Sequence, residues 1–127
     1  MSMMSGDFSQ IEDLLVSEIR LSSIQARIFL LVVINGKMNG SRISKELDIT
    51  EDEAINNSKK LMELGAFIDM PNNEFESMHP RFTAVNMYRK MCERKQIEFK
   101  KNLKIDNIGV VLEKPYDDAR TKYNNKK

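Results

Sequence analysis

The sequence predicts a mainly α-helical fold, because three short amphipathic helices and a two-stranded hairpin follow one another within residues 21–78. The second and third of these helices, of about eight and about fourteen residues, are separated by a turn of about three residues, which is the spacing of a helix-turn-helix. The hairpin completes the order of a winged helix-turn-helix, a module whose last helix usually lies in the DNA major groove. An extra N-terminal helix precedes this unit, and a long C-terminal dimerisation helix follows it.

We divide the chain accordingly into four segments. They are an N-terminal helix in 1–20, the winged helix-turn-helix in 21–80, a C-terminal helical dimerisation segment in 81–113 and a disordered tail in 114–127. The tail is assigned as disordered because the residues after Pro115 are polar.

Apolar spacing and capping residues place the first helices. Apolar residues recur within residues 8–19 at the spacing of one helical stripe. The central helix is expected to start at Ser22, whose hydroxyl can cap it while Gln25 reaches back from three residues on. It should end near Gly36, and apolar residues cover most of its surface between residues 24 and 33. This helix is therefore expected to form the centre of the core.

A second pair of capping signals defines the helix-turn-helix. Ser41 is expected to cap the first of its helices, which runs to Leu47. Thr50 and Glu53 form a capping box at the start of the next helix, which Gly65 closes. The apolar residues of this second helix are expected to face inward.

Two half-buried strands and a long helix complete the chain. Residues 66–70 and 75–78 alternate around Pro71-Asn72-Asn73, which favours a turn. Past Pro80 a narrow apolar stripe with basic flanks predicts a helix too long to bury itself on a small core, so a partner helix is implied. Three apolar residues within 105–112 can continue the stripe. The residues that we assign to a homodimer interface are Val85, Tyr88, Cys92, Phe99 and Leu103.

The charge of the chain is unevenly distributed. Its 127 residues are 41% apolar and 31% charged, with a formal net charge of +1. Residues 1–19 hold four acids and no base, whereas residues 86–104 hold seven Lys or Arg and two acids. The composition supports one small core, and the electrostatic properties that matter for binding are local.

Several classes of function are not expected. Cys92 is the single cysteine, which excludes an intramolecular disulfide and a multi-cysteine zinc site. The longest apolar run, residues 28–34, is too short to cross a bilayer, and no targeting segment is apparent, so we expect a cytoplasmic protein with no membrane partner. His79 has no second metal ligand spaced to work with it, and no glycine-rich phosphate loop is present. We therefore expect no enzymatic activity, no metal and no cofactor.

The same residues carry a resemblance to a known family. The segment LSSIQARIFLLVVINGKMNGSRISKELDITEDEAINNSKKLMELGAFIDM, followed by FESMHP, resembles the N-terminal DNA-binding domain of the archaeal TrmB-type transcriptional regulators. The matching features are the leucine-serine opening with Ala26-Arg27, the entry Asn39-Gly40-Ser41, the turn Leu47 to Ile49, Leu61, Gly65 and Pro80. The resemblance implies binding of promoter DNA as a dimer. Longer members carry a sugar-binding domain, which is not expected here, so no sugar ligand is expected.

Basic and amide side chains are the candidate DNA contacts. Asn56 and Asn57 can pair with adenine edges, and the cations can hold phosphates. The candidate DNA-binding residues are Lys37, Ser41, Arg42, Lys45, Asn56, Asn57, Lys59, Lys60 and Arg81. However, the last helix of the helix-turn-helix begins with the acidic turn Glu51-Asp52-Glu53, which stabilises the helix dipole but repels phosphate.

Three functions remain open at this point. The leading hypothesis is a homodimeric transcriptional regulator that binds double-stranded DNA. The alternative is a winged-helix protein–protein interaction module in transcription or cell-division machinery, with Glu51-Asp52-Glu53 meeting a basic protein partner. The third is a small-molecule or redox sensor with a pocket at the dimer interface beside Tyr88, Met91 and Cys92. The basic stretch from Arg89 to Lys104 is either a solvated helix face or a contact to DNA backbone.

Overall fold

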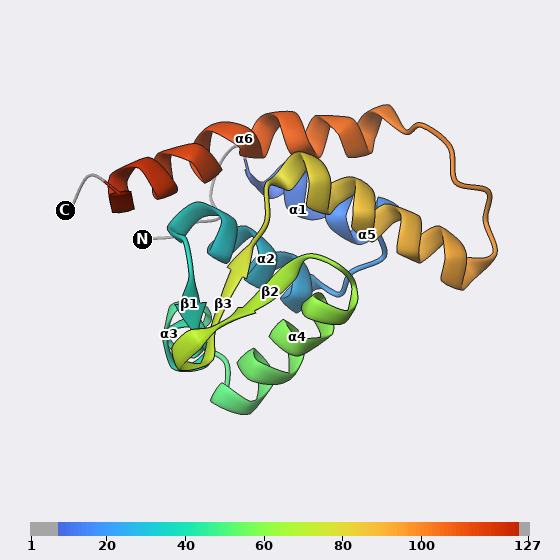
Figure 1. Ribbon diagram of the computed structural model, residues 1–127. Coiled ribbons are helices and arrows are strands. Elements are labelled where there is room, and N and C mark those ends of the chain that lie inside the picture. Colours follow the sequence, from blue (N-terminus) through green and yellow to red (C-terminus); the bar gives the residue numbers. More distant parts are fainter. Residues whose placement is uncertain (1–7, 125–127) are drawn as a thin grey trace.

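The computed structural model describes residues 8–124 as a mainly helical protein with a small antiparallel sheet on one side (Figure 1). Its elements are α1 (Phe8–Glu18), α2 (Ser23–Asn35), β1 (Met38–Asn39), α3 (Gly40–Leu47), α4 (Glu51–Glu63), β2 (Phe67–Met70), the 3₁₀ turn η1 (Pro71–Asn73), β3 (Glu74–Ser77), α5 (Pro80–Lys95) and α6 (Leu103–Asn124). The predicted mainly α class is confirmed, and the element order is consistent with a winged helix-turn-helix.

Helix α2 forms the centre of the core, as the sequence predicted. Ile28, Phe29, Leu30 and Leu31 are each at most 1% exposed, and α1, α4 and α6 pack around them. The Phe29 ring stacks against Phe67 of β2 with 6.3 Å between the ring centroids. Burial of each large apolar side chain contributes about 1.5 to 3 kcal/mol, so α2 holds the other elements together.

The sheet joins the β2–β3 hairpin to β1, the short strand that directly precedes α3. Its strand order is β1-β3-β2, and both pairings are antiparallel. Met38 lies opposite Phe75, and Phe67 lies opposite Ser77. Met38, Phe67 and Phe75 are buried in the same core as α2, so the β2–β3 hairpin is fixed relative to the helices.

Local capping signals predicted the starts of α2 and α4. Ser22 and Gln25 form the expected capping box at α2, and Thr50 and Glu53 form the one at α4, with hydrogen bonds of 3.1 Å. The prediction for α3 was wrong by two residues. Asn39, not Ser41, caps this helix, because the Asn39 side chain accepts from the Arg42 backbone N–H at 2.9 Å.

The single long helix predicted after Pro80 is wrong. Helix α5 ends at Lys95, where Gln96 adopts a left-handed conformation (φ 56°), and the chain turns back through residues 96–102 into α6. Helix α6 then packs antiparallel against α5 and also covers α1 and α2 (Figure 1). The turn is favourable because it buries the apolar stripe at the start of α6 against this protein's own core. The residues of that stripe are Ile105, Ile108 and Leu112, each at most 2% exposed.

The assignment of a disordered tail is wrong for residues 114–124, which continue α6 as a helix. Pro115 lies inside this helix, although proline removes one helical hydrogen bond and usually ends a helix. Contacts made by Arg120 hold the segment in place. Residues 1–7 of the predicted N-terminal segment and residues 125–127 of the tail lie outside the described part.

Within residues 8–124, no helix combines the length and the apolar character that crossing a membrane would require.

Candidate nucleic-acid interface

Helices α3 and α4 pack against one another across a short turn. Asp48 ends α3 in the left-handed conformation (φ 56°), which lets the chain reverse before Thr50 caps α4. The Ser44 hydroxyl donates to the Ile49 carbonyl at 2.6 Å and closes the turn. The outer sides of both helices are therefore presented to solvent in a fixed orientation.

The outer sides of these two helices carry most of the candidate DNA contacts. Exposed candidates on α3 and α4 are Arg42, Lys45, Asn56, Lys59 and Lys60. Lys60 has only a 3.8 Å contact with Glu63, and both side chains are more than half exposed. Such a surface pair is weak, so a phosphate can replace the carboxylate. Ser41 is half-buried at the start of α3.

Asn57 does not belong to this exposed set. Its Nδ2 donates to the Glu53 carbonyl at 2.9 Å, and its Oδ1 accepts from Gln25 Nε2 at 3.3 Å. Both ends of the amide are thus engaged within the protein, and the side chain is half-buried. This geometry argues against the base-reading role predicted for Asn57 and favours a role in joining α4 to α2.

Lys37 and Arg81 lie outside the α3–α4 surface. Arg81 is on the first turn of α5, where its guanidinium is 2.9 Å from Glu113 of α6. Figure 1 shows this end of α5 in the upper layer, away from the outer side of α4. Lys37 and Arg42 border a separate cavity of about 340 Å³ that also includes Arg120.

The helix-turn-helix and hairpin together are acidic. Residues 40–77 contain four Lys or Arg and nine Asp or Glu, a difference of −5. The three carboxylates of Glu51, Asp52 and Glu53 are exposed in the first turn of α4. Long-range attraction of a polyanion to this unit is therefore weak, and any DNA contact here depends on short-range interactions.

A groove of about 980 Å³ separates α4 from the β2–β3 hairpin. Apolar side chains of Ile55, Met62 and Phe75 line it, and Glu63 and Asp69 add carboxylates. Its other lining residues include Ser41, Glu51 and Lys59. Sequence patterns did not reveal this groove, because it forms between elements that only the tertiary fold brings together.

The predicted dimer residues fall into two groups. Cys92 is 1% exposed, and Val85 and Tyr88 are half-buried against the protein's own core. Only Phe99 and Leu103 remain substantially exposed, at 46% and 74%. Because α6 folds back on α5, much of the apolar stripe that had implied a partner helix is buried within the protein itself.

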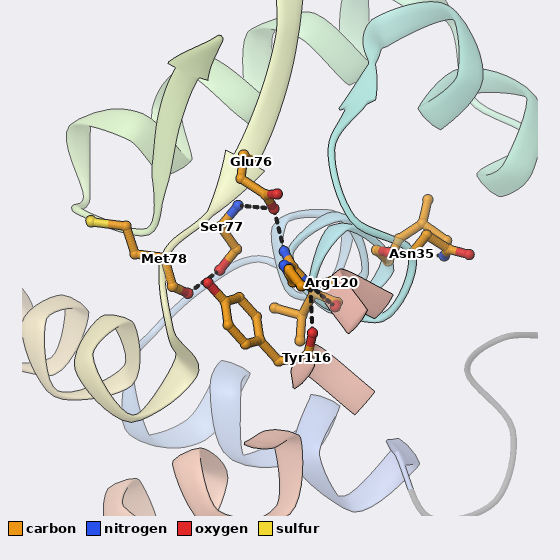
Figure 2. Close-up of polar contacts among 8 residues, drawn as sticks. Asn35, Glu76, Ser77, Met78, Tyr116 and Arg120 are labelled. Carbon is orange, nitrogen blue, oxygen red and sulfur yellow. Dashed lines mark hydrogen bonds and ion pairs between the residues drawn. The ribbon is translucent and has the colours of Figure 1, made fainter. Parts of the chain in front are cut away.

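A polar cluster around Arg120 was missed because its segment was expected to be disordered. The Arg120 guanidinium forms an ion pair with Glu76 of β3 and donates to the Val33 carbonyl at 2.7 Å (Figure 2). It also lies 3.7 Å from the centre of the Tyr116 ring. Burial raises the pKa of the Tyr116 phenol, while the positive charge of Arg120 acts to lower it. Two pairs spaced four residues apart, Tyr116 with Arg120 and Lys114 with Asp118, are sequence signals that favour a helix here.

His79 also has neighbours that sequence spacing did not predict. Ligand atoms of His79, Glu113 and Asp117 lie within 4.8 Å of one another. The His79 Nδ1 accepts from the Arg81 backbone N–H at 3.2 Å, and the Arg81 guanidinium already neutralises Glu113. These contacts describe a polar network that joins the start of α5 to α6.

A scan against protein-family models found no match for this chain, and searches of curated proteins and of solved structures likewise found no similar protein.

Proposed function

We propose that this protein is a cytoplasmic, homodimeric transcriptional regulator that binds double-stranded DNA through α3, α4 and the β2–β3 hairpin. The observation that carries the proposal is the outer face of α4. This face exposes Asn56, Lys59 and Lys60, while the opposite face buries Ala54 and Leu61 in the core. A helix presented in this way, beside a hairpin, suits insertion into a major groove.

Arg42 and Lys45 on α3 extend the same surface with two exposed cations. In the proposed complex they hold phosphates beside the groove, and Asn56 contacts a base edge. The acidic first turn of α4 faces the same side and lowers the affinity. We therefore expect modest duplex affinity, with a shallow dependence on salt because few phosphates are contacted.

The test is duplex binding by charge-reversal variants. Lys60→Glu and Arg42→Glu should each lower affinity for a promoter-derived duplex by about tenfold or more at low salt. Lys114→Glu is the matched control, since Lys114 is an exposed cation on α6 that pairs with Asp118. If all three variants bind duplex as the wild type does, the assignment to α3 and α4 is wrong.

The homodimer part of the proposal has a separate test. Phe82 on α5 and Val110 on α6 are 53% and 51% exposed near the crossing of the two helices. We propose that they contribute to the dimer contact in place of the buried Cys92. The double variant Phe82→Ser/Val110→Ser should shift sedimentation equilibrium toward monomer, whereas Cys92→Ala should not change the mass. A monomeric wild type at micromolar concentration would contradict the homodimer.

The acidic groove between α4 and the hairpin favours a second function, in which the protein docks a basic segment of a protein partner. The groove combines apolar side chains with the carboxylates of Glu51, Glu63 and Asp69, which suits an amphipathic, lysine-rich peptide. Titration with such a peptide should shift the NMR signals of Ile55 and Met62. Glu51→Lys with Asp69→Lys should abolish the shifts, and unchanged shifts would exclude this function.

A further inference from the structure

The end of the α5–α6 hairpin is strongly basic, in contrast to the acidic helix-turn-helix and hairpin. We call residues 89–104 the basic tip. It contains seven Lys or Arg and two acids, a difference of +5, against −5 for residues 40–77. Figure 1 shows its loop projecting at the right-hand end of the α5–α6 pair. The protein thus contains one acidic and one basic segment despite its net charge of +1.

The basic tip also exposes large apolar side chains. Ile97, Phe99 and Leu103 are 48%, 46% and 74% exposed. The Phe99 ring lies against Tyr88 of α5, with 5.9 Å between centroids and 48° between the ring planes. One side of the Phe99 ring therefore packs against the protein, and its exposed part is accessible for stacking with another flat ring.

A shallow cavity of about 610 Å³ lies at this place. Tyr88, Ile97 and Leu103 give it apolar walls, and its other lining residues are Lys100, Lys101, Lys104, Glu98 and Asn102. Phe99 does not line this cavity, but it packs against Tyr88, which does. Apolar walls with a rim of cations match a ligand that joins flat apolar groups to negative charges.

The three lysines at the cavity are available to such a ligand. Lys100 contacts Glu98 at 3.8 Å, Lys101 contacts Asp106 at 2.7 Å, and each lysine side chain is more than two thirds exposed. Lys104 is 66% exposed and lies 3.6 Å from Glu18. Exposed ion pairs of this kind contribute little to stability, so a phosphate can displace the carboxylate.

We infer that the basic tip binds single-stranded nucleic acid, with a base seated against Phe99 and the adjoining phosphates held by Lys100, Lys101 and Lys104. Stacking on an aromatic ring together with a cationic groove is the usual basis of such binding. A duplex offers phosphates but no free base for the apolar walls. A two-fold contact with a second copy would bring two patches of +5 together, which is repulsive.

The experiment is fluorescence anisotropy of the full chain with a labelled oligothymidylate and with a duplex of equal length. Lys100→Glu/Lys101→Glu should weaken binding of the single strand about tenfold or more at low salt. Phe99→Leu keeps an apolar side chain but removes the ring, and should weaken it about fivefold or more.

Matched controls separate this site from the α3–α4 surface. Lys59→Glu/Lys60→Glu carries the same charge change on α4, and Ile68→Ala removes a large apolar side chain that is 40% exposed on β2. Neither control should affect single-strand binding, although Lys59→Glu/Lys60→Glu should weaken duplex binding. Circular dichroism establishes that each variant folds, which is expected because all these side chains lie on the surface.

Three results would overturn the inference. The first is no binding of the single strand at low salt, and the second is equal binding by Phe99→Leu and the wild type. The third is a loss of self-association in Phe99→Leu without any effect on the oligonucleotide, which would assign the tip to a dimer contact.

Discussion

Arg120 of α6 forms an ion pair with Glu76 of β3, and this contact joins the end of the chain to the hairpin next to α4 (Figure 2). The same guanidinium donates to the Val33 carbonyl at 2.7 Å, at the end of the central helix. About a fifth of each side chain in the ion pair is exposed, at 21% and 20%. Arg120 of α6 therefore contacts both the end of α2 and the hairpin.

Replacing Arg120 with alanine should lower the free energy of unfolding by about 2 kcal/mol, because Glu76 loses its cation and Val33 loses a hydrogen-bond donor. This is less than the effect for a fully buried pair, since solvent partly screens the charges. Urea denaturation measures it. Lys114→Ala, which removes an exposed pair with Asp118, is the control and should cost no more than about 0.5 kcal/mol. Equal losses in the two variants would contradict the role of Arg120.

Titration of Tyr116 should make the free energy of unfolding depend on pH in the alkaline range. Burial raises the pKa of its phenol above the usual 10.0, so above that pH the folded state retains more protons than the unfolded state. The free energy of unfolding therefore falls as pH rises through and beyond this value. Tyr116→Phe should show a smaller fall between about pH 9 and about pH 11, with lysine deprotonation common to both proteins. Identical pH profiles would contradict the burial of the phenol.

Gly109 permits the close crossing of α5 and α6. A Cβ at this position would lie 2.7 Å from the Cα of Arg81, which is backbone and cannot move alone. Gly109→Ala should therefore destabilise the protein by about 1 to 2 kcal/mol, although alanine is favoured in helices by about 1 kcal/mol. Asn107→Ala, on the exposed side of the same helix, should be neutral or slightly stabilising. A gain in stability for Gly109→Ala would show that the helices are further apart.

Asn56 and Asn57 are neighbours on α4 with different expected roles. Asn57→Ala removes hydrogen bonds to Gln25 and to the Glu53 carbonyl, and should cost about 1 kcal/mol of stability with unchanged duplex affinity. Asn56→Ala should leave stability unchanged but lower duplex affinity about fivefold or more. Thermal unfolding and anisotropy measure the two effects. If instead Asn56→Ala lowered stability and Asn57→Ala lowered duplex affinity, the roles assigned to the two asparagines would be exchanged.

Local features of this fold could be predicted from sequence. Capping boxes involve residues three apart in the chain, so Ser22 with Gln25 and Thr50 with Glu53 can be recognised without knowledge of any tertiary contact. The apolar surface of α2 likewise indicated its central position. The exposure of Asn56 and Lys60 followed from helical periodicity, because the apolar side of α4 was expected to face the core.

Long-range features could not be predicted in the same way. The stripe of Ile105, Ile108 and Leu112 has the same spacing whether it packs on another subunit or on its own core. The Arg120 contacts span 44 residues to Glu76 and 87 to Val33, distances over which no local pattern operates. The rule that proline ends a helix failed at Pro115, because these contacts outweigh one lost hydrogen bond.

NMR titration of the full chain with a promoter-derived duplex decides whether duplex DNA contacts α3 and α4. If the proposed contact exists, the largest changes in amide signals are expected at Arg42, Asn56, Lys59 and Lys60. Changes confined to residues 89–104, with α3 and α4 unaffected at saturation, would contradict it.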